Sequence, residues 1–152
     1  MKNEIVNVSL TPDGSAVRIV DQTLLPGELR YIELRGREEM FEAIRALRVR
    51  GAPAIGIFAA FSVAVLSRDY PRAEFLARLE ADCAYLDASR PTAVNLKKQL
   101  DRMLAFARAH AGSDDLPALL RQQAQAIYDE DAAMCAAIAE AGEEGECVHN
   151  SN

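Results

Sequence analysis

In the first 35 residues, apolar and polar positions alternate over short runs that turn-forming residues separate. The runs IVNVSL and AVRIVD are rich in β-branched residues and flank the segment Thr11–Ser15. Pro12 fixes φ and Gly14 permits positive φ, so this segment predicts a turn. A second break at 25–28 precedes the run LRYIELR. We therefore predict a small antiparallel sheet within residues 4–35.

Beyond residue 36 the apolar positions recur three or four residues apart, which is the spacing of an amphipathic helix. The pattern predicts a first helix over 37–48 and an apolar second helix over 54–67. Three more helices are predicted: one over roughly 72–87, one that Pro91 opens and residues 111–115 end, and one from Leu116 to about Ala141. The predicted fold class is α+β and mostly α, with a small N-terminal antiparallel sheet followed by a bundle of about five helices.

A chain of 152 residues has the size of one domain and can bury a substantial core. We assign residues 1–141 to this domain, with the sheet at 4–35 and the helices at 37–141. Residues 142–152 are polar, acidic and glycine-containing, so we interpret them as a polar tail or a truncated junction. The charge-free stretch 51–67 falls short of the ~20 predominantly apolar residues that span a bilayer. We expect it to form a helix buried inside the domain.

Half of the residues are hydrophobic and 26% are charged, as in soluble globular proteins. The net charge of −6 argues against broad binding of nucleic acid or of anionic membranes, which needs a basic surface. Cys83, Cys135 and Cys147 lie far apart without a CxxC spacing, so neither a disulfide framework nor a zinc site is predicted. The N-terminal segment lacks the apolar run of a signal peptide. We expect a cytoplasmic protein with no nucleic-acid partner, no membrane partner and no metal site.

Two predicted helix starts carry the same chemistry. The first is VRGAPAIG at residues 49–56. Gly51 lets a ligand approach the backbone, and Pro53 suits the first turn of a helix, where its missing N–H costs nothing. The N–H groups that follow point outward at the positive end of the helix dipole, with Arg50 just ahead of them. An anion placed there would meet backbone donors and a guanidinium together.

The second start is SRPTAVN at residues 89–95, where arginine again precedes proline. Ser89 or Thr92 is a candidate cap of this helix. Two such termini brought together would clamp a phosphate. An alternative interpretation stays open, because proline is common at helix starts. In that case Arg90 is merely solvated, and the small residues around Gly56 serve close helix packing.

The other candidates for chemistry are weaker. Asp21 ends a predicted strand, and we interpret it as a turn cap rather than a ligand-binding residue. His110 falls at a predicted helix C-terminus, where a partial positive charge suits the dipole. Cys83 and Cys135 lie within predicted helices and are expected to pack rather than to react.

Three segments occur in the order found in a known family: DQTLLP at 21–26, VRGAPAIG at 49–56 and RPTAVNL at 90–96, followed by DRM at 101–103. Together they resemble the N-terminal region of methylthioribose-1-phosphate isomerases. That family is related to the regulatory subunits of a eukaryotic translation-initiation exchange factor and to ribose-1,5-bisphosphate isomerases. The resemblance covers nearly the whole chain up to about residue 140.

The resemblance implies a two-part architecture, in which a domain with a small sheet and a helical bundle precedes a larger Rossmann-like domain that is absent here. It implies a homodimer in the full-length form, a small-molecule sugar-phosphate substrate, and no metal or redox cofactor. The implied reaction converts 5-methylthioribose 1-phosphate to 5-methylthioribulose 1-phosphate in methionine salvage. By matching motif positions, the residues that resemble the family's substrate-binding residues are Arg50, Gly51, Ala52 and Arg90.

We assign no catalytic residue. The resemblance places the family's catalytic Cys at a strand end of the second domain and its Asp further on. The ending Cys147-Val148-His149-Asn150 has Cys before His and does not match. Because hydrogen transfer between carbons needs an acid and a base, we predict that this chain alone is inactive. The alternative is a non-catalytic interaction or regulatory module related to the exchange-factor subunits.

Overall fold

The computed structural model describes residues 8–24, 27–46, 48–49 and 52–140, with side chains described up to residue 133 except at residue 52. Within this part, a three-stranded antiparallel sheet comes first, in the order β1-β2-β3. Its strands are β1 (Val8–Leu10), β2 (Val17–Val20) and β3 (Tyr31–Leu34). Val17 pairs with both Leu10 and Leu34, which sets the register. The antiparallel sheet predicted from the sequence is confirmed.

The turn between β1 and β2 has the chemistry that its sequence predicts. Gly14 has a φ of +72°, a conformation that glycine adopts without strain. The Asp13 carboxylate accepts hydrogen bonds from the Thr11 hydroxyl at 2.8 Å and from the Ser15 main-chain N–H at 3.0 Å. Such side-chain bonds satisfy groups that have no ladder partner within a turn, and they hold the hairpin in its register.

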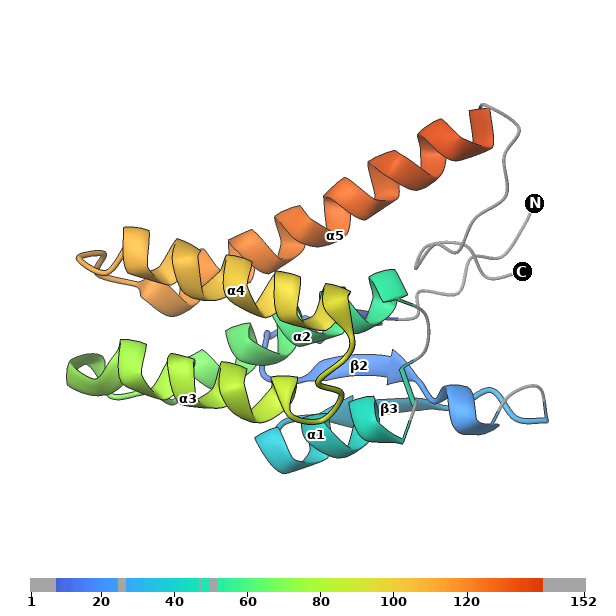
Figure 1. The fold of residues 1–152 in the computed structure, drawn as a ribbon, viewed down its shortest axis with the longest axis horizontal. Helices are drawn as coiled ribbons and strands as arrows, with labels where there is room; N and C mark the ends of the chain where they lie inside the picture. The colour runs from blue at the N-terminus through green and yellow to red at the C-terminus, as the bar shows by residue number, and fades with distance from the viewer. Residues whose placement is uncertain (1–7, 25–26, 47, 50–51, 141–152) are drawn as a thin grey trace.

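Five α-helices follow in the described part of the chain (Figure 1). They are α1 (Arg37–Arg45), α2 (Ala52–Ser67), α3 (Phe75–Asp87), α4 (Val94–Ala109) and α5 (Leu116–Glu140), with short 3-10 turns at Gln22–Leu24 and Arg72–Glu74. Helix α1 ends earlier than the predicted residue 48, because the Arg48 N–H turns back and donates to the Ala43 carbonyl at 2.9 Å. The predicted fold class, a small sheet followed by a helical bundle, is confirmed.

The start of α4 corrects the sequence analysis. The helix begins at Val94 and not at Pro91. Pro91 lies instead in a turn that the Ala93 N–H closes by donating to the Arg90 carbonyl at 2.9 Å. The physical reason is that the backbone of Ala93 is extended, with φ −80° and ψ 101°, so the turn around Pro91 does not continue into the helix.

Neither candidate cap of α4 acts as one. The hydroxyl of Ser89 donates to the Leu86 carbonyl at 2.5 Å and so serves the end of α3. The N-cap position of α4 is Ala93, one residue after Thr92, and within the described residues no side chain caps this terminus. The first N–H groups of α4 are therefore left for solvent or for a ligand.

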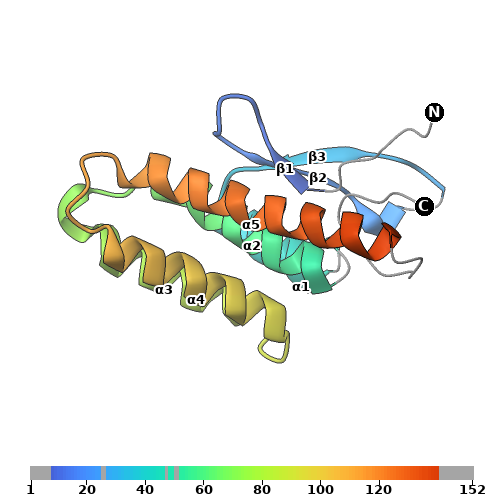
Figure 2. The ribbon, with the colours of Figure 1, turned by 90° about the horizontal axis from the view of Figure 1, so that it is seen from above.

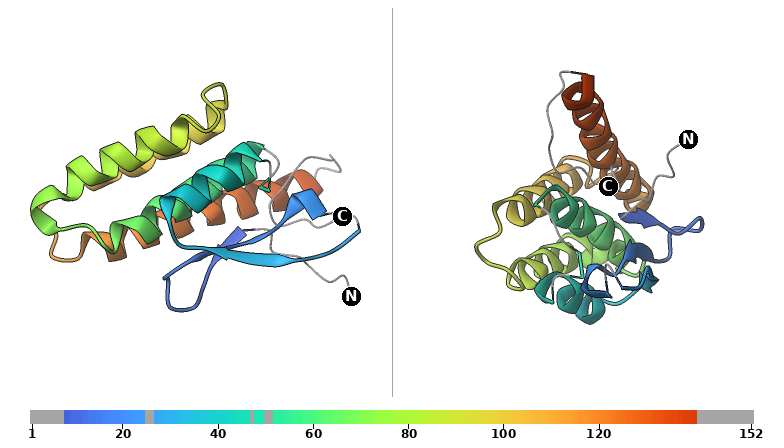
Figure 3. Two further views of the ribbon diagram at one scale, coloured as in Figure 1. Left: turned by 90° about the horizontal axis from the view of Figure 1, so that it is seen from below. Right: turned by 90° about the vertical axis from the view of Figure 1, so that its right-hand side faces the viewer.

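Helix α2 forms the centre of the molecule. Figures 2 and 3 show the sheet on one side of α2 and the pair α3 and α4 on the other. Apolar side chains all around α2 are buried, among them Phe58, Phe61 and Val63, as expected of a helix without a polar face. Val17 and Ile19 of the sheet belong to the same core. The charge-free stretch is thus a buried core helix, as predicted, and no helix in the described ranges has the length and hydropathy of a membrane span.

Candidate functional site

The first turns of α2 and α4 lie side by side at one end of the molecule, at the right of Figure 1. The approach is tightest at Gly56, where an added Cβ would lie 2.8 Å from the Gln99 Cγ and 3.0 Å from the Asn95 carbonyl oxygen. Gly56 belongs to the motif at 49–56 and Asn95 to the motif at 89–95. The fold therefore brings together the two helix starts that the sequence singles out. For Gly56 itself, close helix packing explains the small residue.

A cavity of about 170 Å³ lies just inside these helix starts, between α2, α4 and α5. Its polar lining comprises Asn95, Lys98, Gln99 and Arg102 of α4, and Glu130 and Asp131 of α5. Two basic and two acidic side chains balance, so the cavity lining carries no net charge. A positive field at this end of the molecule comes instead from the N-termini of the two helices.

One of the basic groups in the cavity is committed to the fold. The Arg102 guanidinium donates two hydrogen bonds to the two carboxylate oxygens of Glu130, at 3.0 and 2.9 Å. This forked contact from Arg102 lowers the pKa of Glu130, and in return Glu130 raises the pKa of Arg102. The DRM segment of the family resemblance therefore joins α4 to α5.

Three of the four predicted substrate-binding residues belong to the segment at the start of α2, and the fourth, Arg90, precedes α4. Ala52 is the first residue of α2, whereas Arg50 and Gly51 lie outside the described residues. Arg90 lies in the turn between α3 and α4 and is partly buried. Among the described residues, its guanidinium has no ion-pair or hydrogen-bond partner. A guanidinium without a partner among the described residues is suited to bind an anion.

The segment that leads into α2 is tied to the DQTLLP segment. The buried Asp21 carboxylate accepts hydrogen bonds from the Thr23 N–H at 3.0 Å and hydroxyl at 2.6 Å, and from the Arg48 Nη1 at 2.8 Å. Burial alone would raise the pKa of Asp21, but the hydrogen bonds from Thr23 and Arg48 lower it below its ordinary 3.8. The turn-capping role predicted for Asp21 is confirmed. The sequence did not reveal the link to Arg48, because the two residues lie far apart along the chain.

Cys83 has the packing role predicted for it, and His110 lies at the helix C-terminus where it was predicted. The Cys83 thiol is buried and donates to the Leu100 carbonyl at 3.8 Å. Burial, together with the neighbouring Asp82 carboxylate, raises the pKa of this thiol to about 12, which keeps it from acting as a thiolate nucleophile. His110 ends α4, and its Nδ1 lies 2.8 Å from the Phe106 carbonyl oxygen. The side chain of Cys135 lies outside those described.

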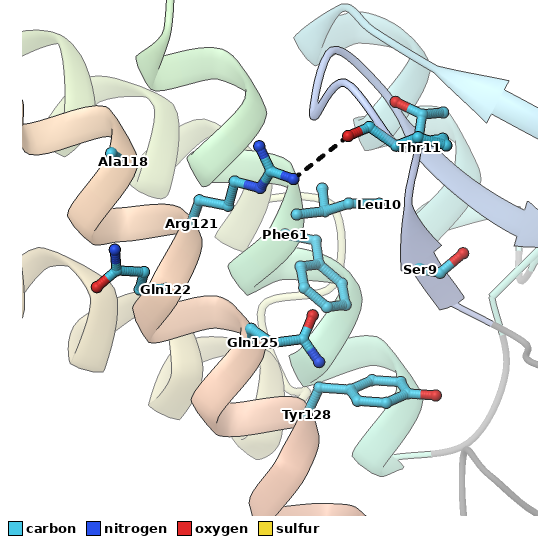
Figure 4. A pocket seen from close by; sticks show the side chains of 10 residues that line it. Ser9, Leu10, Thr11, Phe61, Ala118, Arg121, Gln122, Gln125 and Tyr128 are labelled. Carbon is cyan, nitrogen blue, oxygen red and sulfur yellow. Dashed lines mark hydrogen bonds between the residues drawn. The ribbon is translucent and has the colours of Figure 1, made fainter.

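A larger cavity of about 560 Å³ lies between strand β1 and helix α5 (Figure 4). Ser9 and Thr11 line it on the strand side, and Gln122 and Gln125 on the helix side. The guanidinium of Arg121 at its rim donates to the Pro12 carbonyl at 3.4 Å. These residues form no recognisable sequence motif, because they come from segments about 110 residues apart that meet only in the fold. The same lining contains no acid–base pair.

Solved structures define the class of this fold. The crystal structure of 5-methylthioribose 1-phosphate isomerase from Pyrococcus horikoshii superimposes with a TM-score of 0.77 and 35% identity, covering 83% of this chain and 36% of that chain. The translation initiation factor eIF-2B subunit delta from A. fulgidus superimposes with a TM-score of 0.75 and 30% identity, covering 84% and 38%. The fold is thus the helical domain that these isomerase and initiation-factor chains share. The sequence profile of the Initiation factor 2 subunit family matches residues 48–146, and the chain belongs to this family.

Curated relatives carry isomerase names. The 5-deoxyribose 1-phosphate isomerase of Moorella thermoacetica is 51% identical over 136 residues, covering 86% of this chain and 38% of the relative. The methylthioribose-1-phosphate isomerase of Symbiobacterium thermophilum is 46% identical over 137 residues, covering 87% and 38%. The chain therefore spans less than two fifths of the length of these two relatives. Their aligned part includes both helix-start motifs of this chain.

Proposed function

We propose that this chain is the phosphate-binding part of an aldose–ketose isomerase that converts 5-methylthioribose 1-phosphate to 5-methylthioribulose 1-phosphate in methionine salvage. The observation that carries the proposal is the pairing of the α2 and α4 helix starts at one end of the molecule, together with Arg90 in the turn before α4, whose guanidinium has no partner among the described residues. The names of the relatives support the reaction class.

A phosphate monoester suits this arrangement. Each helix start offers outward N–H groups at the positive end of a dipole, and α4 starts without a side-chain cap. Arg90 supplies a guanidinium that can meet two phosphate oxygens at once. In the proposal Arg50, Gly51 and Ala52 supply the second guanidinium and the main-chain donors at the start of α2.

The names of the relatives also suggest the substrate class. 5-Deoxyribose 1-phosphate and 5-methylthioribose 1-phosphate both carry a phosphate on the anomeric oxygen, and neither has a hydroxyl on carbon 5. A site shared by the two would hold the phosphate and leave the apolar end to be recognised elsewhere. We therefore propose 1-phosphorylated riboses with an apolar carbon 5 as the ligands of this chain.

The same chemistry explains why we propose no turnover by this chain alone. A phosphate on the anomeric oxygen blocks spontaneous ring opening, so the enzyme must open the furanose and move a hydrogen between neighbouring carbons. That transfer needs an acid and a base on the reacting carbons. Around the two helix starts, the Arg102–Glu130 pair is engaged in the fold, and we assign no other described pair to the transfer.

The test uses the purified 152-residue chain. Calorimetric titration compares 5-methylthioribose 1-phosphate with 5-methylthioribose, and phosphorus NMR follows conversion of the phosphate ester. We expect binding that requires the phosphate, and no conversion. Product formation would show that the chain carries its own acid and base, and equal binding of the two sugars would exclude a phosphate site.

A specific observation favours a second candidate, a non-catalytic interaction or regulatory module. The initiation-factor subunit from A. fulgidus superimposes nearly as well as the isomerase from Pyrococcus horikoshii. Such a module needs no sugar phosphate for its role. If sugar phosphates leave the melting temperature of the chain unchanged while it forms a stoichiometric complex with an initiation-factor subunit, this second candidate replaces the first.

A further inference from the structure

The cleft between strand β1 and helix α5 is separate from the paired helix starts (Figure 4). Its volume of about 560 Å³ lies within the range of small-molecule sites in proteins, which runs from about 300 to 1,000 Å³. Among the described residues, its lining has no member in common with the lining of the cavity between α2, α4 and α5. The phosphate site proposed at the helix starts therefore does not account for this cleft.

Arg121 of α5 is the one charged side chain among the described residues that line the cleft. Its guanidinium forms no ion pair with a described carboxylate, and its hydrogen bond to the Pro12 carbonyl is long, at 3.4 Å. Gly14 lets the guanidinium lie against the turn between β1 and β2, because a Cβ at that position would lie 2.9 Å from the Arg121 Nη1. A cation without a compensating charge is thus held at the rim, where it can meet the anionic group of a ligand.

The distribution of charge directs an anion into this cleft. A neighbouring cavity of about 220 Å³ also has Arg121 in its lining, together with Arg68 and the carboxylates of Asp13 and Asp115. Hydrogen bonds, chiefly from Ser15, hold the pKa of Asp13 well below its ordinary 3.8, so this carboxylate stays ionised. Two cations and two anions balance in the smaller cavity, whereas the described lining of the larger cleft carries a net charge of +1. An anion therefore interacts more favourably with the larger cleft.

The rest of the cleft is neutral and suits hydroxyl groups. Gln122 and Gln125 lie on the same side of α5 as Arg121, and Ser9 faces them from β1. The Ser9 hydroxyl and the Gln122 carboxamide have no hydrogen-bond partner among the described residues. The Gln125 Nε2 donates to Asp129 at 3.1 Å, which leaves its Oε1 as an acceptor. Hydroxyl and carboxamide groups both donate and accept hydrogen bonds, as the hydroxyls of a sugar do.

We propose that this cleft binds a small anion with a hydroxyl-bearing body, a sugar acid or a sugar phosphate, with Arg121 on the anionic group and Gln122 and Gln125 on the hydroxyls. A carboxylate and a phosphate share the chemistry that matters here, because each can accept two hydrogen bonds from one guanidinium. A single arginine in a chain with a net charge of −6 does not suit a polyanion such as nucleic acid. The inference does not depend on the function proposed for the helix starts.

The test is calorimetric titration of the purified 152-residue chain with ribonate, ribose 5-phosphate and ribose, three probes built on the same pentose. We expect the anions to bind at least about ten-fold more tightly than neutral ribose, because only they engage the guanidinium. Binding of both anions, or of one alone, supports the inference, and the second result identifies the head group as carboxylate or phosphate. Equal affinity for all three probes, or no binding of either anion, would overturn it.

Arg121→Ala locates the anion within the chain. The side chain is exposed, so its removal should leave the fold intact, and the affinity for the bound anion should fall at least about ten-fold. Gln122→Leu, at another exposed position, should weaken binding at least about two-fold, and it replaces R121A if that variant does not fold. The matched control is Arg108→Ala, which removes an exposed arginine paired with Glu80 and should bind as the wild type does. Wild-type affinity in folded R121A would contradict the inference.

A comparison with Arg90→Ala separates the cleft from the helix starts. R90A should bind ribonate as the wild type does, because Arg90 lies in the turn before α4 and not in the lining of the cleft. If R90A loses the anion while R121A keeps it, the anion binds at the helix starts. That result would overturn the inference and leave the proposed function standing.

A second readout needs no variant. Phenylglyoxal modifies accessible guanidinium groups, and peptide mass spectrometry reports the modification of each arginine separately. The bound anion should slow the modification of Arg121 at least several-fold, while the exposed Arg108 keeps its rate. Equal rates at Arg121 with and without the anion would show that the anion does not contact this guanidinium, and the inference would then be wrong.

Discussion

Substitution of Gly56 by alanine tests the close approach of α2 and α4. The added Cβ would lie 2.8 Å from the Gln99 Cγ, 3.0 Å from the Asn95 carbonyl oxygen and 3.5 Å from the Asn95 carbonyl carbon. The Gln99 side chain can turn away, because it is flexible and only partly buried. The Asn95 carbonyl belongs to the first turn of α4, so it can move only if the helix moves with it.

Two opposing contributions determine how much Gly56→Ala changes the free energy of unfolding. Alanine is favoured over glycine inside a helix by about 1 kcal/mol. Overpacking of a close contact costs about 1–3 kcal/mol. The difference predicts a loss of roughly 1 kcal/mol in the free energy of unfolding, or about 3 °C in melting temperature for a chain of this size. Because α4 must shift away from α2, the affinity for a phosphate ester should fall as well.

Urea denaturation followed by circular dichroism measures this loss. The matched control is Gly112→Ala, where an added Cβ meets nothing within 4 Å. That variant should be as stable as the wild type or up to about 1 kcal/mol more stable, because alanine restricts the unfolded chain. If G56A gained the full helix propensity of about 1 kcal/mol instead, α2 and α4 would not approach as closely as described, and the account of the paired helix starts would fail.

Three further variants or reagents test other parts of the account. The pKa of Asp21 is lower in the folded chain than its unfolded value of 3.8, so the ionised carboxylate stabilises the fold. This contribution is complete above pH 3.8 and disappears as the pH falls through the lower pKa of the folded state. The stability deficit of D21N in urea should therefore shrink below pH 4, and a deficit independent of pH would contradict the Arg48 link. The Cys83 thiol, with its pKa raised to about 12, should resist alkylation by iodoacetamide at pH 8 until urea unfolds the chain, and prompt modification of Cys83 in the native protein would refute its burial. Phe58→Ala, at a position with 0% exposure in the central helix, should cost about 3–5 kcal/mol in urea denaturation, and a loss below about 1 kcal/mol would place Phe58 outside the core.

The regular elements follow from local patterns in the sequence. Apolar spacing marks the five helices, and the cluster around Gly14 marks the hairpin, because both depend on residues that are neighbours along the chain. The start of α4 was placed too early, since Pro91 was given the first helical position although the proline turn keeps it outside the helix. Ala93, whose backbone is extended, separates this turn from α4.

The candidate site was only partly predictable for a different reason. Helix starts with an arginine and a proline can be recognised locally, which is why Arg90 was a candidate from the sequence alone. The hydrogen bond from Arg48 to Asp21 joins residues that only the fold brings together, and so does the contact of Gly56 with α4. No spacing along a single chain encodes such a contact, so the sequence assigned Asp21 a turn cap without its second partner.

The most direct test of the central claim is the affinity of Arg90→Ala for 5-methylthioribose 1-phosphate, measured by calorimetry beside the wild-type chain. Arg108→Ala is the control, because it removes an arginine that is exposed and paired with Glu80. If the helix starts of α2 and α4 bind the phosphate, R90A should bind at least about ten-fold more weakly, since a charge-assisted partner is lost, whereas R108A should bind as the wild type does. Equal affinity in R90A and the wild type would contradict the phosphate site.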